Sequence, residues 1–167
     1  MKLPTKMNPK TPKKINGSVR FLIRSLGLKT TAMYLPLTNV PNTRAGYCFN
    51  NCEDYVKEND GDAVYGWMIW EDRKKGFIEA EFHVVVKKDG QYLDITPRYN
   101  HEEKILFVED NIRNSGRMEE HPDSWYSWTN IKIIDDYVCE MTMPLQVKEL
   151  DHEDSELLPL YTKTEIK

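Results

Sequence analysis

Residues 77–87 carry the pattern that most restricts the fold of this chain. Apolar side chains alternate with a second set that is mostly polar, as in a strand with one face on a core. The apolar set is Ile78, Ala80, Phe82, Val84 and Val86, and the second set is Glu79, Glu81, His83, Val85 and Lys87. Asp89-Gly90 follows, a pair typical of two-residue hairpin turns. The pattern therefore predicts a β-hairpin that returns from Gln91 to Ile95.

The register of this hairpin predicts a specific pair of side chains. If Asp89 and Gly90 are the turn, Val85 lies opposite Asp94. His83 shares a face with Val85, so His83 and Asp94 become diagonal neighbours, at roughly 7–8 Å or less. A slip by one residue would send Asp94 to the apolar face. The hairpin thus predicts an imidazole beside a carboxylate.

The rest of the chain predicts two helices and further strands. Ser18 resembles an N-cap, apolar residues follow at helical spacing, and Gly27 is a stop. After a loop broken by prolines and Gly46, a second helix is predicted from Cys48 to about Asn59. Strands are predicted at 63–71, 105–108 and 131–138. The fold class is α+β, an antiparallel β-sheet with the cysteine-bearing helix packed against it.

Composition and length indicate one domain. The chain has 167 residues, of which 40% are hydrophobic and 30% charged, which is ordinary for a globular protein. Residues 1–14 are rich in lysine and proline and predict a flexible basic arm. Residues 15–150 predict a single catalytic-type domain, and residues 151–167 an acidic tail.

Charge and cysteine content narrow the partners and the compartment. The net charge of −4 argues against nucleic acid as a partner. The absence of any long apolar run argues against a membrane span, and the N-terminus lacks the apolar segment of a secretory signal. Three cysteines are too few for a disulfide framework. We therefore expect a cytoplasmic protein without a cofactor; the oligomeric state is not indicated.

Cys48, His83 and Asp94 follow one another in the order of a nucleophile, a base and an orienting group. A helix N-terminus and a neighbouring imidazolium both favour the thiolate that a nucleophilic cysteine needs. His83 would accept the thiol proton and later protonate the leaving group. Asp94 would hold the imidazole in one tautomer. The sequence therefore predicts a cysteine-dependent site for amide hydrolysis or acyl transfer.

Other residues are candidates for binding the substrate. The backbone N–H of Cys48, with the side-chain amide of Asn42 or Asn51, is a candidate oxyanion site. Trp67, Glu81 and Trp125 are candidate substrate-binding residues, although each tryptophan also fits ordinary core packing. Acidic residues near a cleft would favour a cationic or amine-bearing substrate. A peptide, a protein or a small amide would fit this chemistry.

Two short motifs resemble known enzymes. Arg44-Ala-Gly-Tyr-Cys48 resembles the Arg-Gly-Gly-x-Cys motif of arylamine N-acetyltransferases, with Ala45 in place of a glycine. Asp94-Ile-Thr-Pro97 resembles the Asp-Pro-Thr segment of transglutaminase-like domains. The resemblance spans residues 44–97 and implies a transglutaminase-like or papain-like core that acts through a thioester on Cys48. Residues 66–83 also resemble a group of small uncharacterised proteins, which implies no activity.

Other uses of the same residues remain open. Cys48 fits a small buried core residue, His83 a surface histidine paired with Glu81, and Asp94 the cap of a turn. Cys52 fits the core, or a redox pair with Cys48 one helical turn away. Cys48, Cys52, His83 and Asp94 would also supply four zinc ligands. A non-catalytic binding module on the same fold is the alternative from a different functional class.

Overall fold

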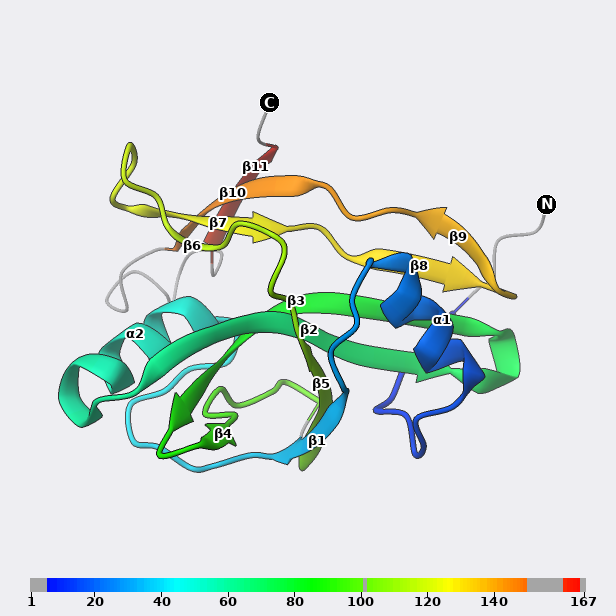
Figure 1. Ribbon diagram of the computed structural model, residues 1–167, viewed down its shortest axis with the longest axis horizontal. Helices are drawn as coiled ribbons and strands as arrows, with labels where there is room; N and C mark the ends of the chain where they lie inside the picture. Colours follow the sequence, from blue (N-terminus) through cyan, green and yellow to red (C-terminus); the bar gives the residue numbers. More distant parts are fainter. Residues whose placement is uncertain (1–5, 101, 150–160, 166–167) are drawn as a thin grey trace.

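The computed structural model describes residues 6–100, 102–149 and 161–165 (Figure 1). The helices are α1 (Gly17–Ser25) and α2 (Cys48–Asn59), with a 3₁₀ turn η1 (Arg73–Lys75). The strands are β1 (Met33–Pro36), β2 (Asp62–Asp72), β3 (Phe77–Lys88), β4 (Gln91–Leu93), β5 (Lys104–Glu109), β6 (Gly116–Arg117), β7 (Ser124–Trp128), β8 (Ile131–Ile134), β9 (Tyr137–Glu140), β10 (Pro144–Glu149) and β11 (Tyr161–Glu165). The fold is α+β with mostly antiparallel sheets, as the sequence predicts.

The hairpin of β3 and β4 has the predicted register. Lys88 pairs with Gln91, and Val86 with Leu93. Asp89 and Gly90 both have positive φ, at 51° and 77°, as a type I′ turn requires. The ladder ends at Leu93, so the return strand is shorter than predicted.

A larger sheet has the strand order β1-β5-β2-β3-β8-β9, with β4 also paired to β3. An isolated parallel bridge joins Leu37 to Asp94, and Thr38 N donates to Asp94 O at 2.8 Å. Because Leu37 follows β1 and Asp94 follows β4, this bridge brings the two ends of β1-β5-β2-β3-β4 together into a nearly closed ring. Asp94 is therefore fixed where this ring closes.

Both helices pack on one face of the β2–β3 pair. The main core combines Val19 and Leu22 of α1, Phe49 and Cys52 of α2, and alternate residues of the two strands such as Phe82. A smaller cluster that includes Met68, Trp70 and Val85 lies on the opposite face. In Figure 1, α1 and α2 lie near opposite ends of the long strands β2 and β3. The cysteine-bearing helix is thus packed against the antiparallel sheet, as predicted.

The prediction of a single strand over residues 131–138 is wrong. Asp135 and Asp136 have positive φ, at 50° and 60°, and form a turn between β8 and β9. The two arms of this hairpin continue as β7 and β10, which pair in a second, four-stranded sheet of order β11-β10-β7-β6. Apolar content alone did not distinguish one strand from a hairpin.

The proposed terminal segments differ from expectation in part. Lys10 forms an isolated bridge with Glu71, and Pro12 is buried, so a free arm is wrong for residues 10–12. Residues 161–165 form β11, so this part of the predicted acidic tail belongs to a sheet. Residues 1–5, 101, 150–160 and 166–167 lie outside the described residues.

The helix predicted to begin after Ser18 starts two residues earlier, at Gly17. Asn16 is the N-cap, and its side chain accepts a hydrogen bond from Val19 N at 2.9 Å. Gly27, at φ +76°, follows its end as predicted. Neither α-helix in the described part of the chain has the length and apolar character needed to cross a bilayer.

Candidate active site

Cys48 is the first residue of α2 and is partly exposed. Gly46 precedes it at φ +83°, a conformation that glycine adopts without strain. The first turn of α2 contains no acidic residue. Backbone N–H groups at a helix start have no partner within the helix and carry partial positive charge. The local fold therefore presents the thiol where an anion is stabilised.

A gap in the pairing of β3 admits this helix end. One edge of β3 pairs with β8 over residues 77–80 and with β4 over residues 86–88. Between these stretches, residues 81–85 have no strand partner on this edge among the described residues. The helix α2 covers this stretch, where Cys52 Sγ contacts the Val84 carbonyl oxygen at 3.5 Å. His83 lies in the middle of the gap. Helix and strand therefore meet at the predicted thiol and imidazole.

His83 and Asp94 form the predicted pair. His83 Nε2 lies 2.9 Å from Asp94 Oδ1. His83 is 5% exposed and Asp94 is fully buried. Because Nε2 is engaged by the carboxylate, Nδ1 is the ring nitrogen left for the thiol. The interpretation of His83 as a surface residue is wrong, as is that of Asp94 as only a turn cap.

The environment of His83 favours its protonated form. Burial alone would lower the pKa of His83, but the charge and hydrogen bond of Asp94 outweigh it, and Cys48 adds to their effect. Together they raise the pKa of His83 from 6.5 to about 10. At neutral pH the imidazole is therefore protonated and available as a proton donor. The influence of Cys48 also indicates that the thiol lies beside this ring.

Arg98 is a fourth member of the cluster. Its Nη2 atom forms an ion pair with Asp94 Oδ2, while His83 holds the other carboxylate oxygen. The Arg98 side chain is 5% exposed. Asp94 is therefore held between two cationic groups.

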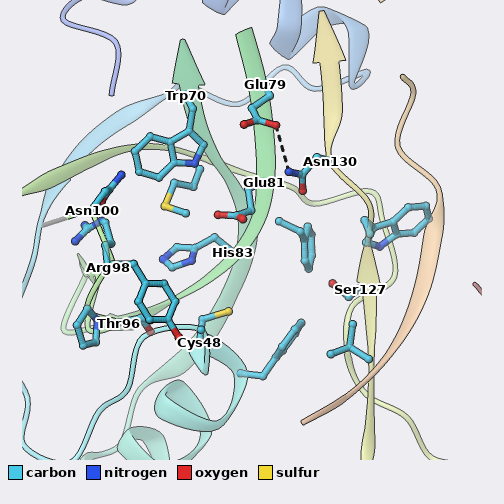
Figure 2. A pocket seen from close by; sticks show the side chains of 18 of the residues that line it. Cys48, Trp70, Glu79, Glu81, His83, Thr96, Arg98, Asn100, Ser127 and Asn130 are labelled. Atoms are coloured by element: carbon cyan, nitrogen blue, oxygen red, sulfur yellow. Dashed lines mark hydrogen bonds between the residues drawn. The ribbon is translucent and has the colours of Figure 1, made fainter. Parts of the chain in front are cut away.

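Cys48 and His83 line a cavity of about 390 Å³. This size suits a small molecule or a side chain. Residues of seven segments line the cavity. They are Pro9, Gly46, Cys48, Phe49, Met68, Trp70, Glu79, Glu81, Phe82, His83, Thr96, Pro97, Arg98, Tyr99, Asn100, Ser127, Trp128, Asn130 and Val147. Figure 2 shows Trp70 and Arg98 on one side of β3, and Ser127 and Asn130 on the other.

Acidic side chains extend along the cavity from His83. Glu79 and Glu81 alternate with buried residues on β3 and share the face of His83, opposite Trp70 and Met68 of β2. Glu79 Oε2 accepts a hydrogen bond from Asn130 Nδ2 at 3.4 Å. Burial raises the pKa of Glu79, and Glu81 adds to the effect. The prediction that Glu81 borders the cleft agrees with this position.

Asn51 is not an oxyanion donor. Its side chain is 3% exposed and is occupied by Arg44 and Thr96: Nδ2 donates to Arg44 O at 2.9 Å and to Thr96 Oγ1 at 3.0 Å, and Oδ1 accepts from Arg44 N at 3.1 Å. It instead links the loop before Cys48 to the segment after Asp94. Asn42 is also wrong as a candidate, because it is exposed at φ +66° and does not line the cavity.

Trp67 and Trp125 are wrong as substrate-binding residues. Trp67 is fully buried, and its Nε1 donates to Asp110 Oδ2 at 2.8 Å. Trp125 is 4% exposed and stacks on Phe49 at 5.1 Å. Instead, Trp70 and Trp128 line the cavity. Strand alternation places Trp70 on the face of His83, whereas Trp67 lies on the other face.

The zinc alternative finds no support in the geometry. Within residues 6–100, 102–149 and 161–165, no three His, Cys, Asp or Glu side chains are grouped as metal ligands. Cys52 is fully buried and points to β3, one helical turn from Cys48. Cys52 therefore belongs to the core, and both cysteines are free thiols.

The aromatic and amide residues that line the remaining walls were not assigned from the sequence. Tyr99 and Asn100 come from the segment after Asp94, Ser127 from β7, and Asn130 from the link between β7 and β8. No spacing in the sequence indicated that β7 would lie across the cavity from β2. Comparisons of this chain with protein-family models, curated proteins and solved structures returned no match.

Proposed function

We propose that the protein is a cysteine-dependent amide hydrolase or acyltransferase with a Cys48–His83–Asp94 triad. The observation that carries the proposal is the buried His83–Asp94 pair beside a partly exposed thiol at a helix start. These are the parts of an activated nucleophile. The adjoining cavity gives a substrate access to them. A transglutaminase-like or papain-like core remains part of the proposal.

Acylation begins from a thiolate and an imidazolium. The thiol proton resides on Nδ1 of His83, and the Cys48 sulfur attacks the substrate carbonyl carbon. A carbon–sulfur bond forms, and the carbonyl oxygen takes the negative charge near the Cys48 backbone N–H. The imidazolium then gives its proton to the leaving nitrogen, the carbon–nitrogen bond breaks, and a thioester remains on Cys48.

Deacylation uses the same groups in reverse. Water or an amine enters after the first product leaves, and His83 accepts its proton as it attacks the thioester. The carbon–sulfur bond then breaks and releases the Cys48 thiolate beside the His83 imidazolium, which restores the starting state. Hydrolysis or transfer depends on whether water or an amine is the acceptor. No cofactor is part of this scheme, and a reducing compartment such as the cytoplasm would keep the thiol active.

The cavity walls suggest the substrate class. Glu81 and Glu79 follow His83 at successive same-face positions of β3, about 7 Å apart along the strand. A substrate lying along β3 would place groups on either side of its amide near these carboxylates. Trp70 lies opposite Glu79 on β2 and provides an apolar surface beside it. We therefore propose a peptide, protein or small amide that carries a cationic group near the reacting bond.

Alkylation rates test the nucleophile, because the chain contains its own reference thiol. Cys139 is exposed and lies on β9, outside the cavity lining. Iodoacetamide labelling, followed by peptide mass spectrometry, gives both rates in one sample. We expect Cys48 to react faster than Cys139 at pH 6, because His83 stabilises its thiolate.

Variants of the base provide the control. His83→Ala should abolish the advantage of Cys48 at pH 6, whereas Asp94→Asn should reduce it and leave Cys139 unchanged. The substitution His121→Ala, at an exposed histidine outside the cavity lining, is the matched control. Equal rates at Cys48 and Cys139 in the unmodified protein, over pH 5 to 8, would contradict the proposal.

A further inference from the structure

The Arg98 guanidinium is buried at a cost. Its side chain is 5% exposed, and one nitrogen pairs with Asp94 Oδ2. The other two nitrogens, Nε and Nη1, are buried and have no hydrogen-bond partner among the described residues. Burying a charged group with unpaired donors is unfavourable. Ion pairs of this kind are often no more stable than apolar side chains of the same volume.

The position of Arg98 points to a role in the cluster. Asp94 uses Oδ1 for His83 and Oδ2 for Arg98. A carboxylate held at both oxygens cannot rotate about its terminal bond without breaking one contact. The backbone of Asp94 is also fixed, by the bridge to Leu37 and the bond from Thr38 N. Because its backbone and its carboxylate are both fixed, Asp94 keeps Oδ1 directed at Nε2 of His83.

We propose that Arg98 is a positioning residue for the proposed reaction: it clamps Asp94 so that His83 keeps Nδ1 toward Cys48. The inference rests on the proposed function for its consequence in catalysis. Its geometric part concerns only the Arg98–Asp94–His83 contacts. No pattern in the sequence indicated a role for Arg98.

Arg98 also balances the charge of the cluster. With a neutral thiol and imidazole, the Arg98–Asp94 pair sums to zero. Transfer of the proton from Cys48 to His83 adds one positive and one negative charge, so the total remains zero. Without Arg98, the cluster would carry a net negative charge in both states. Glu81 and Glu79, on the same face of β3, also line the cavity, and their charges would add to that excess.

The proton on Nε2 of His83 provides a direct test. In the unmodified protein, this proton lies in a buried bond to Asp94 and should give a downfield, slowly exchanging NMR resonance near neutral pH. His83→Gln assigns the resonance by removing it. We expect Arg98→Met to broaden or remove the resonance, and Arg98→Lys to restore part of it, since lysine keeps the charge but not the planar fork.

Cys48 labelling reports the functional consequence. Arg98→Met should lower the iodoacetamide rate of Cys48 about 10- to 100-fold relative to Cys139, by analogy with the loss seen when a group that orients a metal-ligating imidazole is removed. Arg98→Gln keeps a polar but shorter and uncharged side chain, and replaces the methionine variant if that protein does not fold. It should lower the rate in the same direction.

The chain offers a matched control. Asp110 is also held by a ring N–H and a guanidinium, from Trp67 at 2.8 Å and Arg113 at 2.7 Å, but does not line the cavity. Arg113→Met should reduce thermal stability and leave the His83 resonance and the Cys48 rate unchanged. An unchanged resonance and an unchanged Cys48 rate in folded Arg98→Met would overturn the inference. If Cys48 is no faster than Cys139 in the unmodified protein, the proposed function fails instead.

Discussion

Asp94 Oδ1 lies 2.9 Å from His83 Nε2, inside the protein and eleven residues along the chain. The two side chains meet because the Asp89-Gly90 turn sets the register of the hairpin. The same register places His83 on the stretch of β3 that α2 covers. A local turn thus sets the His83–Asp94 pair of the candidate site.

The raised pKa of His83 predicts how stability depends on pH. The folded value is about 10 against 6.5 for the free side chain, so the charged form is stabilised by folding. The contribution is fully present below pH 6.5 and is lost as pH rises through about 10. In a Cys48→Ala background, which removes the thiol's own titration and its part of the shift, Asp94 still raises the pKa of His83. The free energy of unfolding should therefore still fall as pH rises above 6.5 through the folded pKa.

Urea denaturation at several pH values measures this change. The double variant Cys48→Ala/His83→Gln should lose much less stability between pH 6.5 and 10, because glutamine does not titrate. If the free energy of unfolding changed equally with pH in the two proteins, the His83–Asp94 pair would not hold a proton in this range.

The position of Asn51 predicts that its replacement changes both the stability of the protein and the reactivity of Cys48. Replacement by alanine removes its hydrogen bonds to the Arg44 backbone and to the buried Thr96 hydroxyl. We expect Asn51→Ala to cost about 1–3 kcal/mol of stability and to slow Cys48 alkylation, since the loop before the helix loses its anchor. Asn59→Ala, at an exposed position of the same helix, should change neither quantity by much. A stable Asn51→Ala protein with a normal Cys48 rate would refute the anchoring role.

The position of Glu81 predicts that Cys48 reacts preferentially with cationic reagents. The carboxylate lines the cavity two residues from His83, and screened interactions of exposed charges are modest. Glu81→Gln should slow the reaction of Cys48 with 2-bromoethylamine about two- to fivefold, with little change for neutral iodoacetamide. Glu140→Gln, at an exposed residue of β9 outside the cavity lining, is the control. The same ratio of the two rates in the Glu81 and Glu140 variants would argue against the cationic subsite.

Local signals in the sequence predicted part of the fold. The alternation of residues 77–87, the Asp89-Gly90 turn and the helix at Cys48 depend on neighbouring residues and were confirmed. The break at Asp135-Asp136 was missed because two aspartates at positive φ are less usual than a glycine-containing turn. The ring closure through Leu37 and Asp94 joins residues distant in the sequence, so no local pattern could indicate it.

For the candidate site, the sequence predicted the residues that a hairpin and a helix start bring together. It assigned Trp67 and Trp125 to the cleft because tryptophan composition does not reveal which face a ring occupies. Asn51 was misassigned because its partners lie in two loops. Arg98 was missed because it reaches Asp94 from an irregular segment, where no periodicity relates the two positions.

Acylation of Cys48 tests the central claim most directly. The protein is mixed with p-nitrophenyl acetate at pH 7, and the acetylated peptides are followed over time by mass spectrometry. The account predicts rapid acetylation of Cys48, its loss as the thioester hydrolyses, and little Cys48 acetylation in His83→Ala. Acetylation of Cys48 no faster than that of Cys139, or equally fast without His83, would contradict it.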